Sequence, residues 1–280
     1  MGVSVARQTL SLTLQNSGAA MAREVGIDDA IVAGWTGRDA TAVEKHITEL
    51  EALGVRRPAA TPIFYRVAAA RLTTATEIEV VGARSGGEVE FVLLQHGGRM
   101  WVGAGSDHTD REVETYGVTV SKQMCDKPVA PVFWAFDDVA PHWDRLTLRA
   151  HVIENGERKI YQEGPVAAML KPLDLIGRCA LAAGTAGVPP ALSQQNASPV
   201  LSGEAGGTGH PKSQGDLGTG TPAVPDGRAQ LPDNTLMFCG TLAARGGVRP
   251  TERFEFEIED PVLGRSIAHG YSVRILPVLG

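Results

Sequence analysis

The sequence predicts an α+β protein that is predominantly β. Short strand-like runs recur along most of its 280 residues, and helical spacing is confined to three stretches, near residues 40–53, 110–123 and 165–182. Glycine and asparagine stand between several of these runs, where tight hairpin turns need them. The apolar share of 43% is enough to build a core, so a chain that is disordered throughout is excluded.

The N-terminal part combines two strands and one helix. LSLTL and AIVAGW, at 10–14 and 30–35, have strand character. The helix is predicted at 40–53, because apolar residues there follow near-helical spacing and Gly54 stands at the position of a C-cap.

Two hairpins are predicted in the remainder of the chain. EVEFVLLQ and RMWVGAG flank Gly97-Gly98, and LTLRAHVIE and ERKIYQEG flank Asn155-Gly156. Five further strands are predicted, at PIFYRV, EIEVVG, TLMFCGTL, RFEFEIED and YSVRILPV.

Residues 184–230 differ from the rest of the chain. They hold ten Gly and six Pro and no Phe, Tyr or Trp. Such a composition buries too little apolar area to offset the entropy of ordering the segment. We therefore expect a disordered insertion within one domain that spans residues 1–280.

Bulk properties exclude several classes of function. The formal net charge is −6 and no basic run is present, so nucleic-acid binding is not expected. The three cysteines form no zinc spacing, and we expect them to be reduced. The N-terminus lacks the features of a signal peptide, and the longest apolar stretch is too short to span a membrane. A cytoplasmic protein without membrane contact is expected.

Three carboxylates are candidates for a metal site. Glu88 and Glu90 lie two apart on a predicted strand and so point to the same face, and the hairpin could return Asp107 beside them. Mg²⁺ or Mn²⁺ prefers such oxygen ligands. From spacing alone a solvated strand edge is the favoured alternative, because Glu77 and Glu79 have the same spacing, and a loop aspartate before a helix is often a cap.

Three further residues are candidates for catalysis. His46 and Glu49 lie three apart on the predicted helix, where a carboxylate could orient the imidazole as a general base. An exposed pair of little energetic value is the alternative. Lys122 precedes an apolar stretch and is either a buried cation beside a substrate oxygen or a cation at a helix C-terminus.

Taken in order along the chain, these segments resemble the fumarylacetoacetate hydrolase family. GRDATAVEKHITE is similar to its lid motif, which implies a catalytic dyad of His46 and Glu49. EVE and SDHTDRE are similar to its metal motifs, which implies that Glu88, Glu90 and Asp107 bind a metal and that Arg111 binds substrate. SKQMCDKPVAP is similar to the segment with its active-site lysine, at Lys122. LPDNTLMFCGTLAARGG resembles its substrate-binding turn, at Gly240 and Thr241.

The resemblance covers about residues 30–275 outside the insertion, and NGERKIYQEG also resembles a hairpin of the family. Three positions depart from its motifs. Arg66 in PIFYRV replaces a lysine, Glu114 replaces a substrate-contacting glutamine, and Leu242 replaces a proline. These changes leave the proposed metal ligands in place and put the substrate in question.

The resemblance implies a fumarylacetoacetase C-terminal-like mixed β roll or sandwich with an N-terminal helical lid. It also implies Mg²⁺ (or Mn²⁺ or Ca²⁺), a small 2-oxo acid substrate and a homodimer, for which PVFWAF at 131–136 is either an interface or core. The expected reaction is hydrolysis of a C–C bond in a 2-oxo or 1,3-dicarbonyl acid. The alternatives are decarboxylation, hydration or dehydration, or tautomerisation at the same site, and a metal-binding scaffold without catalysis.

Overall fold

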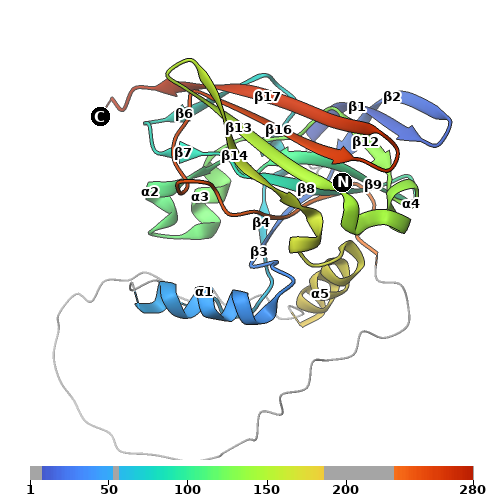
Figure 1. Cartoon of the computed structure of the whole chain (residues 1–280), viewed down its shortest axis with the longest axis horizontal. Coiled ribbons are helices and arrows are strands. Elements are labelled where there is room, and N and C mark those ends of the chain that lie inside the picture. The colour runs from blue at the N-terminus through green and yellow to red at the C-terminus, as the bar shows by residue number, and fades with distance from the viewer. Residues whose placement is uncertain (1–7, 53–56, 186–229, 280) are drawn as a thin grey trace, which may run out of the picture.

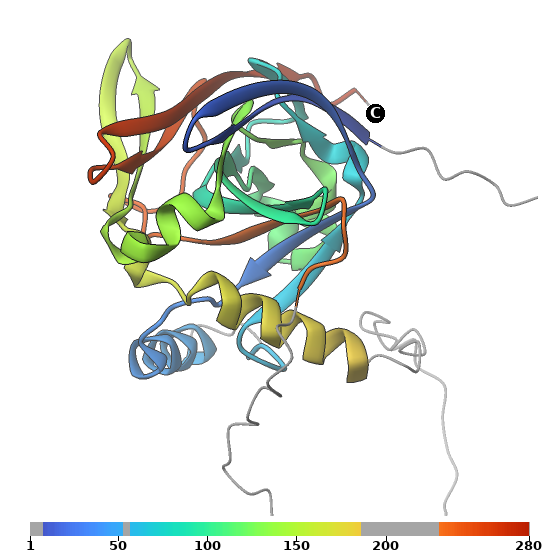
Figure 2. The same cartoon turned by 90° about the vertical axis from the view of Figure 1, so that its right-hand side faces the viewer.

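The computed structural model describes residues 8–52, 57–185 and 230–279, and most of its regular elements are strands (Figure 1). An eight-stranded sheet has the order β2-β1-β12-β9-β8-β15-β3-β4, and a five-stranded sheet has the order β14-β13-β16-β17-β6. The strands curve around one another into a roll, with helices α1 and α5 on one side of it (Figure 2). The larger sheet is mixed, because β1 runs parallel to β12 and β15 runs parallel to β3. The predicted class, α+β and predominantly β, is confirmed.

The eight-stranded sheet consists of β1 (Gln8–Asn16), β2 (Ala19–Ile27), β3 (Asp29–Gly34), β4 (Ile63–Val67), β8 (Val89–His96), β9 (Arg99–Ser106), β12 (Val132–Ala135) and β15 (Thr235–Thr241). The five-stranded sheet consists of β6 (Glu77–Val81), β13 (Thr147–Glu154), β14 (Glu157–Pro165), β16 (Arg253–Asp260) and β17 (Arg265–Leu276). Two small pairs join β5 (Leu72–Thr73) to β11 (Lys127–Pro128), and β7 (Ser85–Gly86) to β10 (Thr109–Asp110).

The helices are short and lie outside the sheets (Figure 1). They are α1 (Ala40–Ala52), α2 (Arg111–Glu114), α3 (Val118–Met124), α4 (Phe136–Val139) and α5 (Pro172–Thr185), with 3-10 turns η1 (Ala69–Arg71), η2 (Ala140–Arg145) and η3 (Val166–Ala168). Within the described ranges, no helix combines the length and the apolar content that crossing a membrane requires.

β8 lies near the middle of the larger sheet and is buried on both faces. On one face, Phe91 and Leu93 belong to the core shared by the two sheets. On the other face, Val92 and Leu94 belong to a second core inside the roll. Because strand side chains alternate, Glu90 lies on the same face as Val92, beside this second core.

Both predicted hairpins are present, and their turns explain the residues that form them. Gly97 and Gly98 have φ angles of 63° and 70°, and Asn155 and Gly156 have φ angles of 54° and 78°. Two successive positive φ angles match the right-handed twist of the flanking strands, and glycine and asparagine adopt them at low cost.

Several expectations need correction. The β2 strand was not predicted, because its sequence AAMAREVGI does not alternate and most of it is exposed at the sheet edge. The helix predicted at 110–123 is two helices, α2 and α3, interrupted where Gly117 is extended at φ −174°. The helix predicted near 165–182 begins at Pro172, after the 3-10 turn η3.

The apolar stretch at 131–136 is core. It forms β12 between β1 and β9, and Phe133 and Trp134 are fully buried within the chain. The helix predicted at 40–53 is confirmed as α1. The segment 184–230, predicted to be disordered, lies almost entirely outside the described residues.

Candidate active site

The β8–β9 hairpin brings the three predicted metal-binding carboxylates together. In its register Glu90 lies opposite Gly105 and Val89 lies opposite Ser106. The chain continues this pairing past the strand ends, since the backbone N–H of Asp107 donates to the carbonyl of Glu88 at 3.0 Å. Glu90 and Asp107 are buried, and Glu88 retains 16% side-chain exposure.

Asp107 is held between two lysines. Lys122, from α3, donates from Nζ to Oδ2, and Lys127, from β11, lies with Nζ 3.0 Å from Oδ1. The Thr109 hydroxyl donates to the same Oδ1 at 3.1 Å. Burial alone would raise the pKa of Asp107, but the two ammonium groups hold it well below its usual range, so Asp107 is ionised.

The two glutamates have raised pKa values. Burial and the negative charge of Asp107 raise the pKa of Glu90 well above its usual value, although the backbone N–H of Gly240 donates to Oε2 at 2.6 Å. Burial also raises the pKa of Glu88, and Arg111 and Lys122 oppose that shift. Lys122 is thus attracted electrostatically to all three carboxylates.

Arg111 joins the carboxylates from the start of α2. Its Nη2 contacts Glu88 Oε2 at 2.9 Å, and its Nη1 contacts Glu114 Oε2 at 2.9 Å. Its third nitrogen, Nε, is buried and has no hydrogen-bond partner among the described residues. A buried donor of this kind is costly to leave unpaired, so an acceptor on a bound ligand is its natural partner. Glu114 neutralises part of the guanidinium charge at a position where the family motif has a neutral glutamine.

The end of β15 lies against Glu90. Gly240 has a φ of 98°, and a Cβ at this position would lie 1.7 Å from Thr36 Oγ1, so only glycine fits. The Thr241 hydroxyl donates to the carbonyl of Val89 at 2.7 Å, between the two glutamates. The structure thus brings Gly240 into contact with Glu90 and Thr241 into contact with Val89.

The helix that carries His46 and Glu49 is α1, and the side chains of both residues lie outside the described part of the chain. Asp39 begins this helix, since its Oδ1 accepts from the backbone N–H groups of Thr41 and Ala42. Arg38 anchors the preceding segment through two bonds to Asp144, at 3.0 and 2.8 Å, and one to the carbonyl of Met169.

Two polar residues of the motifs make their side-chain contacts away from the carboxylates. Arg66 is 60% exposed and pairs with Asp29 at 2.5 Å. His108, in the SDHTDRE segment, is fully buried, and its ring nitrogens contact Tyr271 Oη at 2.8 Å and Ser85 Oγ at 2.9 Å. Burial, with repulsion from Lys127, lowers the pKa of His108 to about 3, so this imidazole is neutral.

Two residues that sequence reasoning missed complete the site. Lys127 is fully buried against Asp107, as described above. Gln162, from β14, accepts from the Val89 N–H at 2.9 Å and donates to Thr241 Oγ1 at 2.8 Å and to the Leu242 carbonyl at 2.5 Å. The hairpin motif around Gln162 was the available signal, because a glutamine at a buried strand position needs partners.

The donor set suits a hard divalent cation. Carboxylate oxygens are the ligands that Mg²⁺ prefers, and Glu88, Glu90 and Asp107 supply them at neighbouring positions, with Lys122 attracted to all three. In the arrangement seen, each carboxylate is engaged by a different donor, and the described residues contain no group of three His, Cys, Asp or Glu spaced to hold a metal.

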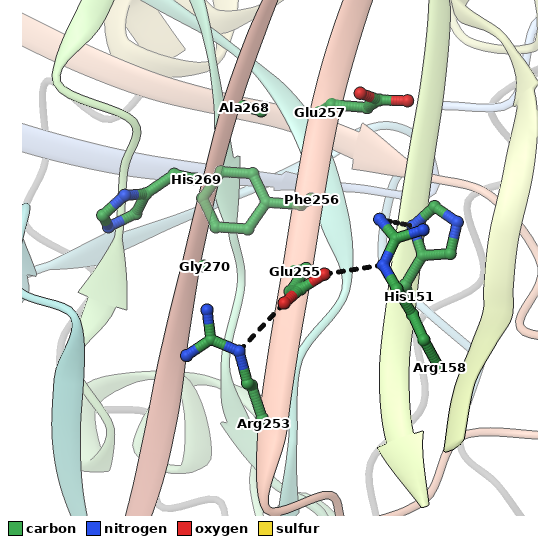
Figure 3. A pocket seen from close by; sticks show the side chains of 9 residues that line it. All are labelled: His151, Arg158, Arg253, Glu255, Phe256, Glu257, Ala268, His269 and Gly270. Carbon is green, nitrogen blue, oxygen red and sulfur yellow. Dashed lines mark hydrogen bonds and ion pairs between the residues drawn. The ribbon is translucent and has the colours of Figure 1, made fainter. Parts of the chain in front are cut away.

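A separate pocket of about 250 Å³ lies on the outer face of the five-stranded sheet (Figure 3). Its charged side chains neutralise one another, since Glu255 accepts from Arg158 at 2.8 Å and from Arg253 at 2.9 Å. Arg158 also contacts His151 at 3.0 Å. None of the predicted site residues lines this pocket.

Comparisons with known proteins give one family and one fold. A family model described as "Protein of unknown function (DUF2848)" matches residues 33–197 and 221–271, more than half of the chain. The comparison with curated proteins gave no match. The chain is similar in structure to Cg1458 with inhibitor (13% identity, 93% of this chain and 84% of that chain, TM-score 0.55). It is also similar to 2-keto-3-deoxy-D-arabinonate dehydratase complexed with magnesium and 2,5-dioxopentanoate (14% identity, 92% and 77%, TM-score 0.50). At this identity the likeness establishes the shared fold.

Proposed function

The chain belongs to the DUF2848 family, and from the chemistry of its site we propose that it is a divalent-metal-dependent enzyme acting on a small 2-oxo acid. The observation that carries the proposal is the group of Glu88, Glu90 and Asp107, of which the last two are buried, beside Arg111, whose buried Nε has no described partner. The raised pKa values of Glu88 and Glu90 show that their ionisation would be favoured by a further cation, and the unpaired guanidinium nitrogen would be satisfied by an anionic acceptor. A divalent ion chelated by a 2-oxo acid would supply the cation, and the carboxylate of the acid would supply the acceptor.

Glu88, Glu90 and Asp107 would hold the ion, with Mg²⁺ the first candidate and Mn²⁺ or Ca²⁺ possible replacements. When bound, the ion supplies Lewis-acid polarisation of the 2-oxo group. Arg111 would bind the substrate carboxylate through Nε, which has no other described partner. The turn at Gly240 and Thr241 would line the substrate opposite Arg111, because its backbone already contacts Glu90.

For the finer reaction we propose hydrolysis of a C–C bond, as in an acylpyruvate. His46, oriented by Glu49, would take a proton from water while the water oxygen bonds to the distal carbonyl carbon. The bond to the neighbouring carbon then breaks, and its electron pair passes to the 2-oxo fragment as an enolate. Lys122, which remains charged because neighbouring carboxylates raise its pKa despite burial, would stabilise the enolate oxygen. Protonation of the enolate carbon yields a carboxylic acid and a 2-oxo acid.

The shared fold supports the 2-oxo acid class. One structural neighbour is a 2-keto acid dehydratase whose complex contains magnesium and 2,5-dioxopentanoate. The same neighbour favours a second candidate reaction, dehydration at the same site. Glu114 also favours a departure from the hydrolases, because it occupies the Arg111 guanidinium where the family motif has glutamine. Full neutralisation of Arg111 would leave a metal-binding scaffold without catalysis.

The test is turnover of an acylpyruvate and of a 2-keto-3-deoxy sugar acid by the purified protein, with Mg²⁺ and after removal of metal by EDTA. We expect turnover that EDTA abolishes and Mg²⁺ restores, and that Glu90→Gln loses. Glu79→Gln is the matched control, because Glu77 and Glu79 share the spacing of Glu88 and Glu90 but Glu79 is exposed on β6. Turnover that survives complete metal removal would refute the proposal.

Variants of His46 and Glu49 separate hydrolysis from reactions that need no activated water. His46→Ala and Glu49→Gln should abolish hydrolysis, which requires an activated water. A reaction that needs no activated water, such as decarboxylation, should survive both substitutions. Product analysis by mass spectrometry distinguishes the outcomes, since hydrolysis adds one water, dehydration removes one, and decarboxylation releases CO₂.

A further inference from the structure

Lys127 is a fully buried lysine to which the sequence assigned no role. It lies on the two-residue strand β11, which pairs in parallel with β5 at Leu72. Its Nζ lies 3.0 Å from Asp107 Oδ1 and donates to the backbone carbonyl of His108. Both partners are buried, so this ammonium group has no contact with solvent and no room to leave.

Lys127 reaches Asp107 from a different element than Lys122 does. Lys122 comes from α3 and contacts Oδ2, and Lys127 comes from β11 and contacts Oδ1. Arg66 does not contribute, because its side chain is 60% exposed and pairs with Asp29.

Asp107 is therefore engaged on both oxygens by positive charge. Lys122 contacts Oδ2 and keeps 8% exposure, with its Nζ 5.7 Å from the centre of the Tyr65 ring. Lys127 contacts Oδ1 and keeps 0%. Of the two, only Lys122 keeps any exposure to solvent, and Lys127 is entirely enclosed.

A divalent ion that uses Asp107 must share it with Lys127 and lie close to two further cations, Lys122 and Arg111. Repulsion between like charges is strong where water is excluded, so these cations oppose an ion that enters alone. A 2-oxo carboxylate bound at the same time adds negative charge, which offsets the repulsion between these cations and the divalent ion. Because binding free energies are linked, each ligand raises the affinity of the other by the same factor.

We propose that Lys127 is a positioning residue of the active site, which fixes Asp107 through Oδ1 and makes divalent-cation binding depend on a bound 2-oxo carboxylate. This inference rests on the proposed function, in which Asp107 is a metal ligand. It assigns to Lys127 a role in coupling the two ligands in addition to its packing.

The experiment measures Mn²⁺ affinity of the full-length protein by the EPR signal of free Mn²⁺, without an added acid, with pyruvate and with acetate. We expect pyruvate to tighten Mn²⁺ binding by at least about tenfold in the wild type, and acetate, which lacks the 2-oxo group, to have less than a third of that effect. In Lys127→Met the pyruvate effect should fall below about threefold. Arg66→Met, which removes an exposed cation outside the site, should retain the wild-type effect.

The outcomes separate the inference from the function beneath it. A pyruvate effect below about twofold in the wild type overturns the inference, even where Lys127→Met fails to fold. Wild-type coupling in a folded Lys127→Met variant assigns Lys127 a structural role and also overturns it. A wild type that binds no Mn²⁺ with or without pyruvate refutes the proposed function itself.

Discussion

Replacing Gln162 by leucine should destabilise the protein by about 2–5 kcal/mol, a large effect for a change that nearly preserves volume. Gln162 is fully buried on β14, in the smaller sheet, and its amide contacts two strands of the larger sheet. Leucine fills most of the same space but can neither accept from Val89 nor donate to Thr241 and Leu242.

The magnitude follows from what each partner loses. The Val89 N–H is buried and has no replacement acceptor, which costs about 1–3 kcal/mol. Thr241 keeps its own bond to the Val89 carbonyl at 2.7 Å, and Leu242 is only partly buried, so water can reach its carbonyl. These two lost bonds add about 0.5–1 kcal/mol each.

Urea unfolding, followed by tryptophan fluorescence and by circular dichroism, measures the change. Gln123→Leu is the matched control, because Gln123 makes one hydrogen bond, to the Ala68 N–H at 2.8 Å, at a partly exposed position. It should cost less than about 1 kcal/mol, since water replaces the lost bond. Equal destabilisation by the two variants would refute the view that Gln162 links the sheets at the site.

Three further predictions test other parts of the structure. Gly240→Ala should cost more than about 2 kcal/mol and prevent Mn²⁺ binding, because its Cβ would overlap Thr36. Gly156→Ala, at a similar φ but in open space, should cost only about 1–2 kcal/mol, and equal thermal shifts would contradict the steric argument. Burial alone would raise the pKa of Asp260. Hydrogen bonds from His142 and from backbone N–H groups outweigh that effect, and the pKa lies below its usual value. Asp260 therefore adds stability above about pH 4 that is lost as pH falls through its folded pKa, so Asp260→Asn should flatten the fall in urea midpoint below pH 4, and an unchanged slope would contradict this. We also propose a single catalytic domain in which 184–230 is an insertion, so a short Gly-Ser linker in its place should keep Tm within about 2 °C, and a collapse of Tm would show a structural role.

The proximity of the three carboxylates depends on local rules, although spacing alone favoured a solvated strand edge and the resemblance was needed to favour a site. Glu88 and Glu90 follow the two-residue period of a strand, and the Gly97-Gly98 turn fixes the register that returns Asp107 beside them. The nearly continuous apolar run of β8 is typical of a strand that is buried on both faces. Each of these inferences needs only contacts between residues fewer than 20 positions apart.

Lys127 could not be predicted in the same way. Its position depends on the pairing of β11 with Leu72 on β5, 55 residues earlier in the chain, and β11 is too short to have a periodic pattern. Arg66, where the family motif has a lysine, lies at an exposed position of β4 and pairs with Asp29. The β2 strand lacked alternation for a related reason, because an edge strand needs few apolar residues.

The burial of β8 on both faces has a consequence for genetic experiments. The strand that carries Glu90 also fills two cores, through Phe91 and Leu93 on one side and Val92 and Leu94 on the other. A screen for inactive variants will therefore recover insoluble protein from the apolar positions of β8. A loss of activity in this strand, including that of Glu90→Gln, reports on chemistry only when the variant is shown to be folded. The segment from α2 to α3 differs, since it carries Arg111 and Lys122 and also has exposed positions at Tyr116, Val120 and Met124. Random substitution at its exposed positions should yield soluble variants with altered substrate preference, so directed evolution of this protein should begin there and leave the strand untouched.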